Sequence, residues 1–277
     1  MSGGHGIIES ATNGTFMKNI NFRFLEGAVQ MNIILTSSLG GSFKVNGKRI
    51  PSVFLTNNGL LDKLKALWVE DSKVMIICAS PNDYEKNDSV CACLKEAFPM
   101  SGLSISYIEK CDDRNEKLIE KLSEMDVILL AGGHVPTQNM FMKKIGLKER
   151  LIDFNGLLIA WSAGSMNCAS NVYAAPELEG EAVDTGFKRW ISGLGLTETN
   201  IFPHYQSLKD DYLDGLRVME DITYVDSYTH EILAMNDGSY ITIENGTEIL
   251  YGEAYRIKNG NLEMICRNGE VFVLKEG

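Results

Sequence analysis

The sequence predicts an α/β fold, a three-layer sandwich with a mostly parallel central sheet, and two patterns indicate it. Short apolar runs recur at Ile33–Leu35, Val74–Cys78, Ser104–Ile108, Val127–Leu130 and Leu157–Ala160. These runs are apolar on both faces and end at turn residues, as central parallel strands do when helices cover both sides of a sheet. Helical segments separate them, at Leu60–Trp68, Asp88–Phe98 and Asn115–Ser123. In such alternating sheets, active sites lie at the carboxyl ends of the strands.

The last third of the chain has a different pattern and predicts a strand-rich C-terminal edge of the sheet. The segment Ile232–Leu274 consists of short strand-like runs with repeated turn signals between them. These signals are Asn236-Asp237-Gly238, Asn245-Gly246, Asn259-Gly260 and Asn268-Gly269. Asn-Gly and Asp-Gly pairs between apolar runs are typical of β-hairpins.

The N-terminal segment differs from the rest in composition. Residues 1–30 are rich in Gly, Ser, Asn and Thr, and the first strand pattern begins at Met31. We therefore expect a leader or a poorly ordered extension over residues 1–30 and a single α/β domain over residues 31–277. The length of 277 residues is within reach of one large α/β domain.

Charge and cysteine content exclude several classes of function. The formal net charge is −11, and an acidic surface repels nucleic-acid phosphates and anionic lipids, so we predict neither nucleic acid nor a membrane as a partner. The six cysteines form no Cys-x-x-Cys pair and no metal-ligand spacing, so we predict no metal and no cofactor. Scattered thiols without a recognisable export signal favour the cytoplasm. The sequence leaves the formation of a homo-oligomer open.

The strongest motif is an apolar strand that leads directly into a serine flanked by small residues, Leu157 to Gly164 (LLIAWSAG). A nucleophile elbow requires this arrangement, because the strand delivers the serine into a tight turn that only small neighbours allow. Ala160 stands where the usual G-x-S-x-G pattern has its first glycine. The serine could equally cap the helix that follows. The motif alone therefore predicts either a nucleophile or a helix cap at Ser162.

A second strand ends in a pair of glycines, Gly132 and Gly133. Their backbone N–H groups, together with that of Ala163, could form an oxyanion hole. A glycine pair is also common in a simple turn between a strand and a helix, so this alternative stays open. We interpret the adjacent His134 as a loop residue.

A serine nucleophile requires a base, and the chain has only four histidines, at positions 5, 134, 204 and 230. His204 follows an apolar stretch and Pro203, which is typical of a rigid turn at a strand end. We therefore predict His204 as the base, with a purely structural role as the alternative. We interpret His230 as structural.

In this order, the three motifs resemble those of the peptidase E family of aspartyl dipeptidases and cyanophycinases. The matching segments are Gly132-Gly133-His134, Trp161 to Gly164, and Phe202-Pro203-His204-Tyr205. The resemblance covers roughly residues 31–260 and implies a class I glutamine-amidotransferase-like sandwich with serine in place of the amidotransferase cysteine. It also implies that Ser162 is the nucleophile and His204 the base.

The resemblance implies an acidic third member of the triad at one of two positions. Glu177 follows the loop Ala174-Ala175-Pro176, which can bring its side chain back over the site. Asp237 lies in an Asn-Asp-Gly turn, which is also a good turn without any function. We predict Glu177 in preference to Asp237. Either carboxylate would fix the tautomer of the imidazole and stabilise the imidazolium ion.

These assignments predict a serine peptidase that hydrolyses a dipeptide or a short peptide through an acyl-enzyme at Ser162, with no cofactor. The dipeptidases of the family carry an arginine after the histidine that pairs with the substrate aspartate. No arginine stands at that place between Lys209 and Arg217 here, and the acidic residues Asp210, Asp211 and Asp214 would either repel an acidic substrate or form a solvated helix face.

The alternatives are a cyanophycinase-like isopeptide hydrolase and a catalytically silent protein that binds small peptides. The serine in the elbow argues against an amidotransferase subunit.

Overall fold

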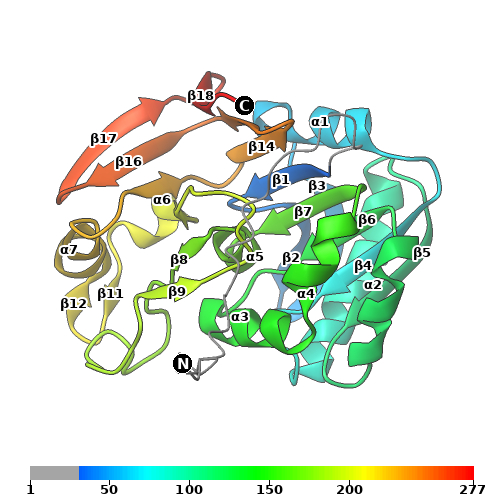
Figure 1. Ribbon diagram of the computed structural model, residues 1–277, viewed down its shortest axis with the longest axis horizontal. Helices are drawn as coiled ribbons and strands as arrows, with labels where there is room; N and C mark the ends of the chain where they lie inside the picture. The colour runs from blue at the N-terminus through cyan, green and yellow to red at the C-terminus, as the bar shows by residue number, and fades with distance from the viewer. Residues whose placement is uncertain (1–30) are drawn as a thin grey trace, which may run out of the picture.

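The structure is a computed structural model that describes residues 31–277, so the expected extension over residues 1–30 lies outside the described part of the chain. An eight-stranded sheet forms the middle of the molecule (Figure 1). Its order is β18 (Val271–Lys275), β15 (Thr247–Tyr251), β14 (Tyr240–Glu244), β1 (Asn32–Thr36), β7 (Leu157–Trp161), β6 (Val127–Leu130), β4 (Ser72–Ile77) and β5 (Ile105–Cys111).

The five strands from β1 to β5 in this order are parallel to their neighbours. Strands β14, β15 and β18 pair antiparallel and extend the sheet on one side. The predicted mostly parallel sheet with C-terminal strands at its edge is therefore confirmed.

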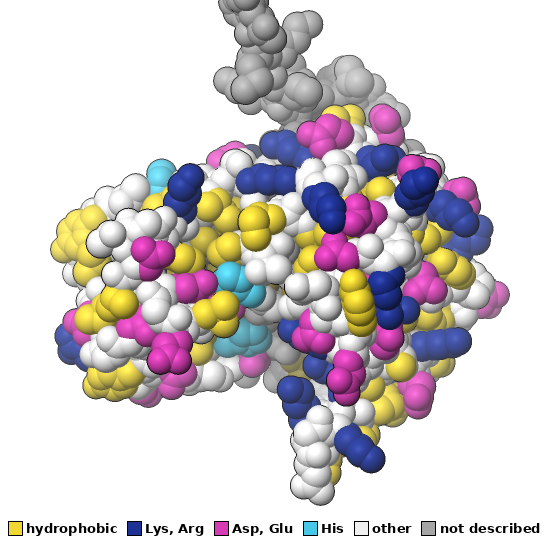
Figure 2. All heavy atoms as spheres, turned by 90° about the horizontal axis from the view of Figure 1, so that it is seen from below, with side chains coloured by type: hydrophobic (Ala, Val, Ile, Leu, Met, Phe, Trp, Pro, Cys, Tyr) yellow, Lys and Arg dark blue, Asp and Glu magenta, His cyan; other side chains and the backbone are white. Residues whose placement is uncertain are grey.

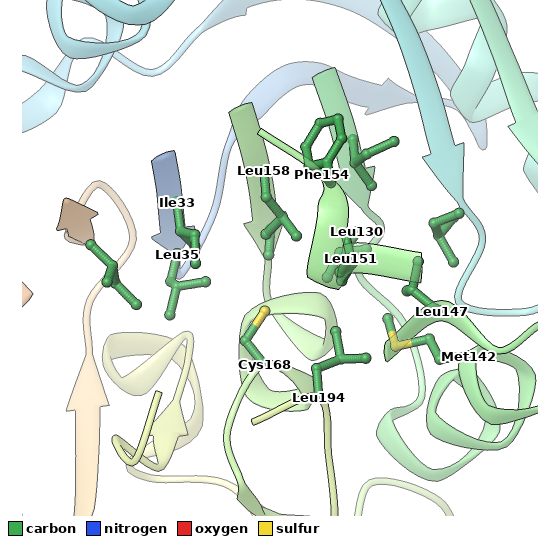
Figure 3. Packing of buried hydrophobic residues seen from close by; sticks show 14 of the residues in the cluster. Ile33, Leu35, Leu130, Met142, Leu147, Leu151, Phe154, Leu158, Cys168 and Leu194 are labelled. Atoms are coloured by element: carbon green, nitrogen blue, oxygen red, sulfur yellow. The ribbon is translucent and has the colours of Figure 1, made fainter. Parts of the chain in front are cut away.

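Helices cover both faces of the parallel strands, which explains why those strands are apolar on both faces. On one face, α1 (Leu60–Leu67) and α2 (Tyr84–Met100) pack Leu64 and Phe98 against a cluster that contains Ile34. On the other face, α3 (Val135–Lys144), α4 (Leu147–Arg150) and the 3-10 helix η2 (Glu116–Glu124) pack against Ile33 and Leu35 (Figure 3). Successive side chains of a strand point to opposite faces, so neighbouring residues of β1 belong to different layers.

The helix bounds differ from the prediction at one place for a clear reason. Helix α2 begins at Tyr84 rather than at Asp88, because the Asp83 carboxylate accepts a hydrogen bond from the Lys86 N–H at 3.2 Å and caps the helix there. The first turn of α2 is mostly exposed and carries no apolar periodicity, so the sequence pattern does not reveal it.

The C-terminal third also contributes to a second sheet, in addition to the strands that extend the edge of the first. Its order is β10 (Ile201–Phe202), β13 (Ile232–Met235), β16 (Ala254–Lys258) and β17 (Asn261–Cys266). Turn residues predict that two strands pair, but they do not predict which sheet the hairpin joins. Here β13 pairs in parallel with β10, which comes from an earlier part of the chain.

Shorter elements lie between the strands of the two sheets. The hairpins are β2 (Gly40–Val45) with β3 (Lys48–Phe54), β8 (Asn171–Tyr173) with β9 (Trp190–Ser192), and β11 (Tyr212–Leu213) with β12 (Leu216–Arg217). The short helices are α5 (Ala163–Asn167), α6 (Tyr205–Leu208), α7 (Tyr224–Asp226), the 3-10 helices η1 (Asn57–Gly59) and η3 (Leu151–Asp153), and the π-helix η4 (Val218–Thr223). Within residues 31–277, no helix has the length and apolar character that crossing a membrane requires.

Candidate active site

The serine of the elbow lies in a strained turn between β7 and α5. Ser162 has φ 51° and ψ −120°, a backbone conformation that residues with a side chain rarely adopt. Among the described residues, its side chain forms no capping hydrogen bond with α5, so the geometry does not support the helix-cap alternative. Strain of this kind costs about 1–3 kcal/mol and clusters at functional sites.

Close packing explains the small residues on both sides of Ser162. A Cβ atom at position 164 would lie 2.3 Å from the carbonyl oxygen of Leu130, so α5 can approach β6 only with Gly164 at this position. Ala160 is fully buried in β7, between Leu35 of β1 and Leu130 of β6. The turn therefore depends on small residues at both positions, with Ala160 in place of the first glycine of the usual pattern.

The end of β1 holds both the elbow and the histidine loop. The Ser162 N–H donates a hydrogen bond to the Thr36 carbonyl oxygen at 3.1 Å, and the Ser165 hydroxyl donates to the same oxygen at 2.8 Å. The next residue, Ser37, accepts a hydrogen bond from the His204 N–H at 2.8 Å. Because Thr36 and Ser37 are consecutive, the backbones of Ser162 and His204 are fastened to adjacent positions of one strand end.

The imidazole of His204 is oriented by Asp237. Nδ1 of His204 lies 2.7 Å from Oδ1 of Asp237. A carboxylate can only accept hydrogen bonds, so Nδ1 carries the proton and Nε2 keeps a lone pair for accepting another. The Ser37 hydroxyl donates to the same Oδ1 at 2.8 Å, and the Asp237 N–H donates to Oε1 of Gln206 at 2.9 Å. Figure 2 shows histidine side chains in the hollow between two lobes of the molecule.

The environment of Asp237 keeps its carboxyl group ionised. Burial alone would raise its pKa, but the hydrogen bond and the charge of His204, with the hydrogen bonds of Ser37 and Gln206, outweigh burial and hold the pKa below its usual value. A carboxylate that stays charged beside the imidazole is the form that stabilises an imidazolium ion.

Glu177, the residue favoured from the sequence, is not the one that contacts Nδ1 of His204. It does lie close enough for the charge of His204 to act on it. Glu177 is an exposed residue, yet desolvation of its carboxyl group, together with the charge of Glu181, raises the pKa of Glu177 to about 7. The Asn-Asp-Gly turn thus orients the imidazole, while Glu177 borders the site.

The glycine pair lies beside the elbow. A Cβ atom at Gly132 would stand 2.7 Å from Nε1 of Trp161 and 3.2 Å from Cβ of Ser162, so a side chain there would collide with the elbow. Ala163 is the first residue of α5, and the first N–H groups of a helix have no partner within the helix. Gly132 therefore lies directly beside the elbow, and Ala163 follows the serine at the start of α5.

Within residues 31–277, the two remaining histidines, His134 and His230, are engaged in structural contacts. Nδ1 of His134 lies 2.7 Å from Oγ1 of Thr137, and Nε2 lies 2.9 Å from Oε1 of Glu181. These contacts join the start of α3 to the loop that carries Glu177. The ring of His230 packs edge-on against Trp190, with 4.6 Å between the ring centroids.

Asp214, one of the acidic residues after His204, has a structural role. The Asp214 carboxylate accepts hydrogen bonds from the N–H groups of Gly180 and Ala182, at 2.8 and 2.9 Å, and so orders a turn. Arg217 pairs with Asp221 at 2.7 Å on the surface. Asp214 and Arg217 are therefore both engaged with neighbouring protein groups.

Sequence reasoning missed Ser37 and Gln206. Ser37 directly follows the first strand, and its position at a carboxyl end is the one signal that could have marked it. Within residues 31–277, no group of three or more His, Cys, Asp or Glu residues could hold a metal ion.

Comparisons with known proteins place this geometry in a family. The model of peptidase family S51 matches residues 56–251. A peptidase from an acI-B1 Actinobacterium has a similar structure, with 14% identity, a TM-score of 0.57, and coverage of 88% of this chain and 97% of that chain. A protein from Listeria monocytogenes EGD-e, described as a peptidase E, gives 18% identity, a TM-score of 0.54, and coverage of 79% and 97%. At these identities the two structures show a shared fold. A search of curated proteins gave no match.

Proposed function

The chain belongs to peptidase family S51, and from that premise we propose that it is a serine peptidase that cleaves a dipeptide or short peptide through an acyl-enzyme at Ser162. One observation carries the proposal. A strained serine and a histidine paired with a carboxylate are fastened to consecutive residues of one central strand. A carboxylate at Nδ1 leaves Nε2 of His204 free to accept the serine proton.

The proposed reaction begins with proton transfer from the Ser162 hydroxyl to Nε2 of His204 as the serine oxygen attacks the peptide carbonyl carbon. Asp237 holds the proton on Nδ1 and stabilises the imidazolium ion that forms. In this assignment Asp237, and not Glu177, is the third member of the triad.

The N–H groups of Gly133 and Ala163, with Gly132 beside them, hold the negative oxygen of the tetrahedral intermediate. His204 then returns the proton to the leaving amine as the C–N bond breaks, which leaves an ester between Ser162 and the acyl part of the peptide. Water, deprotonated by His204, hydrolyses this ester. The chemistry requires no metal or cofactor.

The six free cysteines fit a reducing compartment, and we propose the cytoplasm as the site of action. A homo-oligomer stays an open prediction. An isopeptide hydrolase of the cyanophycinase kind would use the same catalytic groups, whereas a silent peptide-binding protein would bind the peptide without cleaving it.

The test is hydrolysis of a panel of dipeptides and β-linked isopeptides by the wild type and by Ser162→Ala. We expect cleavage of α-linked dipeptides by the wild type only, and a fluorophosphonate probe should label the wild type at Ser162. Preferential cleavage of β-linked substrates would identify the isopeptide hydrolase. Peptide binding with neither turnover nor labelling would identify the silent binding protein and refute the proposal.

A further inference from the structure

A small cavity lies beside the elbow. Its volume is about 80 Å³, and Gly132 and Trp161 form one end of its wall. Because a Cβ at Gly132 would nearly touch Ser162, this end of the cavity adjoins the candidate nucleophile. Binding sites for drug-sized ligands are usually several times larger, so this cavity suits one small chemical group rather than a whole peptide.

The charged lining of the cavity is entirely cationic. Arg49 and Lys86 line it, and in the described part of the chain no Asp or Glu does. The protein as a whole is acidic, with 37 acidic against 26 basic residues, so a purely basic cavity runs against the average composition. A local field of this sign attracts anions to the position where it is concentrated.

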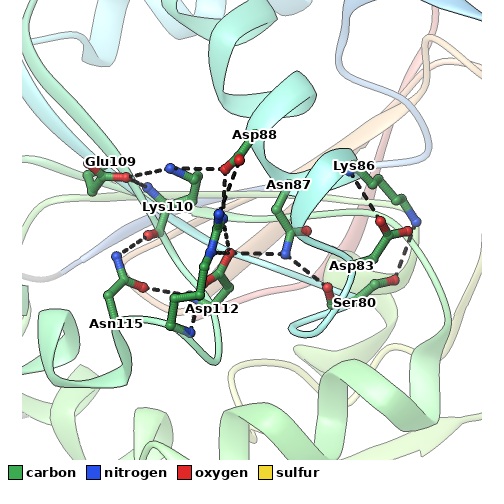
Figure 4. A network of polar contacts seen from close by, with 10 residues as sticks. Ser80, Asp83, Lys86, Asn87, Asp88, Glu109, Lys110, Asp112 and Asn115 are labelled. Carbon is green, nitrogen blue, oxygen red and sulfur yellow. Dashed lines mark hydrogen bonds and ion pairs between the residues drawn. The ribbon is translucent and has the colours of Figure 1, made fainter.

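Lys86, on the first turn of α2, lines the cavity, and Figure 4 shows its side chain beside Ser80. Its Nζ donates to Oγ of Ser80 at 3.4 Å and lies 3.6 Å from the position that a Cβ at Gly133 would take. The ammonium group therefore stands next to the glycine pair of the candidate oxyanion hole. Nearby Lys110 and Arg114 are both engaged in ion pairs, but Lys86 has no carboxylate within 4.0 Å among residues 31–277.

Arg49 reaches the same cavity from strand β3. Its Nη1 donates to Oγ of Ser42 on β2 at 2.8 Å, and across the described residues it forms no ion pair. The guanidinium group has five N–H donors, so most of them stay available. The hairpin can lie this close because Gly41 has φ 78° and a Cβ there would stand 2.6 Å from the ring of Phe54.

We propose that this cavity is a carboxylate-binding subsite of the active site, in which Lys86 and Arg49 pair with a carboxylate of the peptide substrate. The inference rests on the proposed function, since the bound group belongs to the peptide whose amide Ser162 attacks. Arginine and lysine together offer a fork of donors and a point charge, the combination suited to a carboxylate. The carboxylate comes either from an acidic side chain or from the α-carboxylate of the leaving residue.

Matched substrates separate these two sources. Asp-Leu against Asn-Leu tests the side chain, and Asn-Leu against Asn-Leu-amide tests the terminal carboxylate. For the source that is used, kcat/KM should be about 10- to 100-fold higher with the charge, as expected for hydrogen bonds to a charged group. Lys86→Ala and Arg49→Ala should each remove most of this ratio.

The matched controls are Lys95→Ala on α2 and Lys48→Ala on β3, which remove an exposed charge from the same elements. Both should keep the ratio of the wild type, and Lys86→Arg should keep most of it. Equal cleavage of charged and uncharged peptides by the wild type would overturn the proposal, as would ratios in Lys86→Ala and Arg49→Ala that equal those of the controls.

A binding experiment tests the subsite even if the chain cleaves nothing. Calorimetric titration of Asp-Leu and Asn-Leu-amide into Ser162→Ala should give about 10-fold or tighter binding of the charged peptide, and adding Lys86→Ala should abolish the difference. Loss of turnover with this preference intact would refute the proposed function alone. Turnover without any charge preference would refute the subsite alone.

Discussion

Asp237→Asn and Glu177→Gln should have very different effects, because the two carboxyl groups stand in different relations to His204. Asp237 accepts the Nδ1 hydrogen bond at 2.7 Å, whereas Glu177 borders the site without this contact. An asparagine is neutral and can also donate to Nδ1, which would place the imidazole proton on the wrong nitrogen.

The magnitude follows from the geometry of the pair. The side chains of His204 and Asp237 are 33% and 37% exposed, so the medium between them resembles that near a protein surface. For charge centres about 4 Å apart in an effective dielectric constant of about 20, the attraction is about 4 kcal/mol. Losing it from the transition state lowers kcat by about 10³-fold. Glu177→Gln should lower kcat by less than about 10-fold, because no direct contact to the imidazole is lost.

The assay is steady-state hydrolysis of the dipeptide of the panel with the highest kcat/KM. The Ser162→Ala variant gives the background rate. Thermal melting by circular dichroism checks that each variant is folded. The reasoning fails if Glu177→Gln loses about 10³-fold and Asp237→Asn stays within about 10-fold of the wild type. The Asn-Asp-Gly segment would then be no more than a turn.

Three further outcomes are expected. Ser37→Ala should lower kcat about 10-fold or more with little change in KM, because the imidazole loses a support and the buried His204 N–H loses its acceptor, and pre-steady-state kinetics should place the loss in acylation. Gly164→Ala should destabilise the fold by about 3 kcal/mol in urea unfolding, since the new Cβ overlaps a backbone oxygen at 2.3 Å; an unchanged midpoint would contradict the packing. The raised pKa of Glu177, about 7 against 4.5 in the unfolded chain, means that its contribution to stability is full below pH 4.5 and is lost as the pH rises through 7. Glu177→Gln should therefore stabilise the protein more at pH 8 than at pH 5 in paired urea titrations.

The parallel strands were predictable because burial on both faces requires a short run of consecutive apolar residues in the sequence. The predicted strand Val127–Leu130 has the bounds of β6, and all four of its residues are buried. Helix α2 was predicted too short because its first turn is held by a cap and not by an apolar face. The second sheet could not be predicted, because the pairing of β13 with β10 depends on packing between segments about thirty residues apart.

The site residues were predictable only where the neighbouring residues in the sequence also form the turn that the chemistry requires. Ser162 and the glycine pair leave a local signature, since a strand end must be followed by small residues there. Asp237 and Ser37 lie 33 and 167 residues from His204 in the chain, and only the fold brings them to it. Lys86 lies on an ordinary exposed helical turn, and its place in a cavity becomes visible only once β3 and the glycine pair are positioned.

Ser162 is hydrogen-bonded to Thr36, and His204 to Ser37. The spacing between Ser162 and His204 therefore depends on the end of a central strand. These anchor residues belong to the end of a strand flanked on both sides, by β14 and β7, and such central strands usually open only when the whole domain unfolds. Local opening motions of the surrounding loops can therefore change access to Ser162 without changing its alignment with His204. On heating, peptide binding should be lost first. The alignment of Ser162 and His204 should be lost in a separate, later step, together with the unfolding of the whole domain.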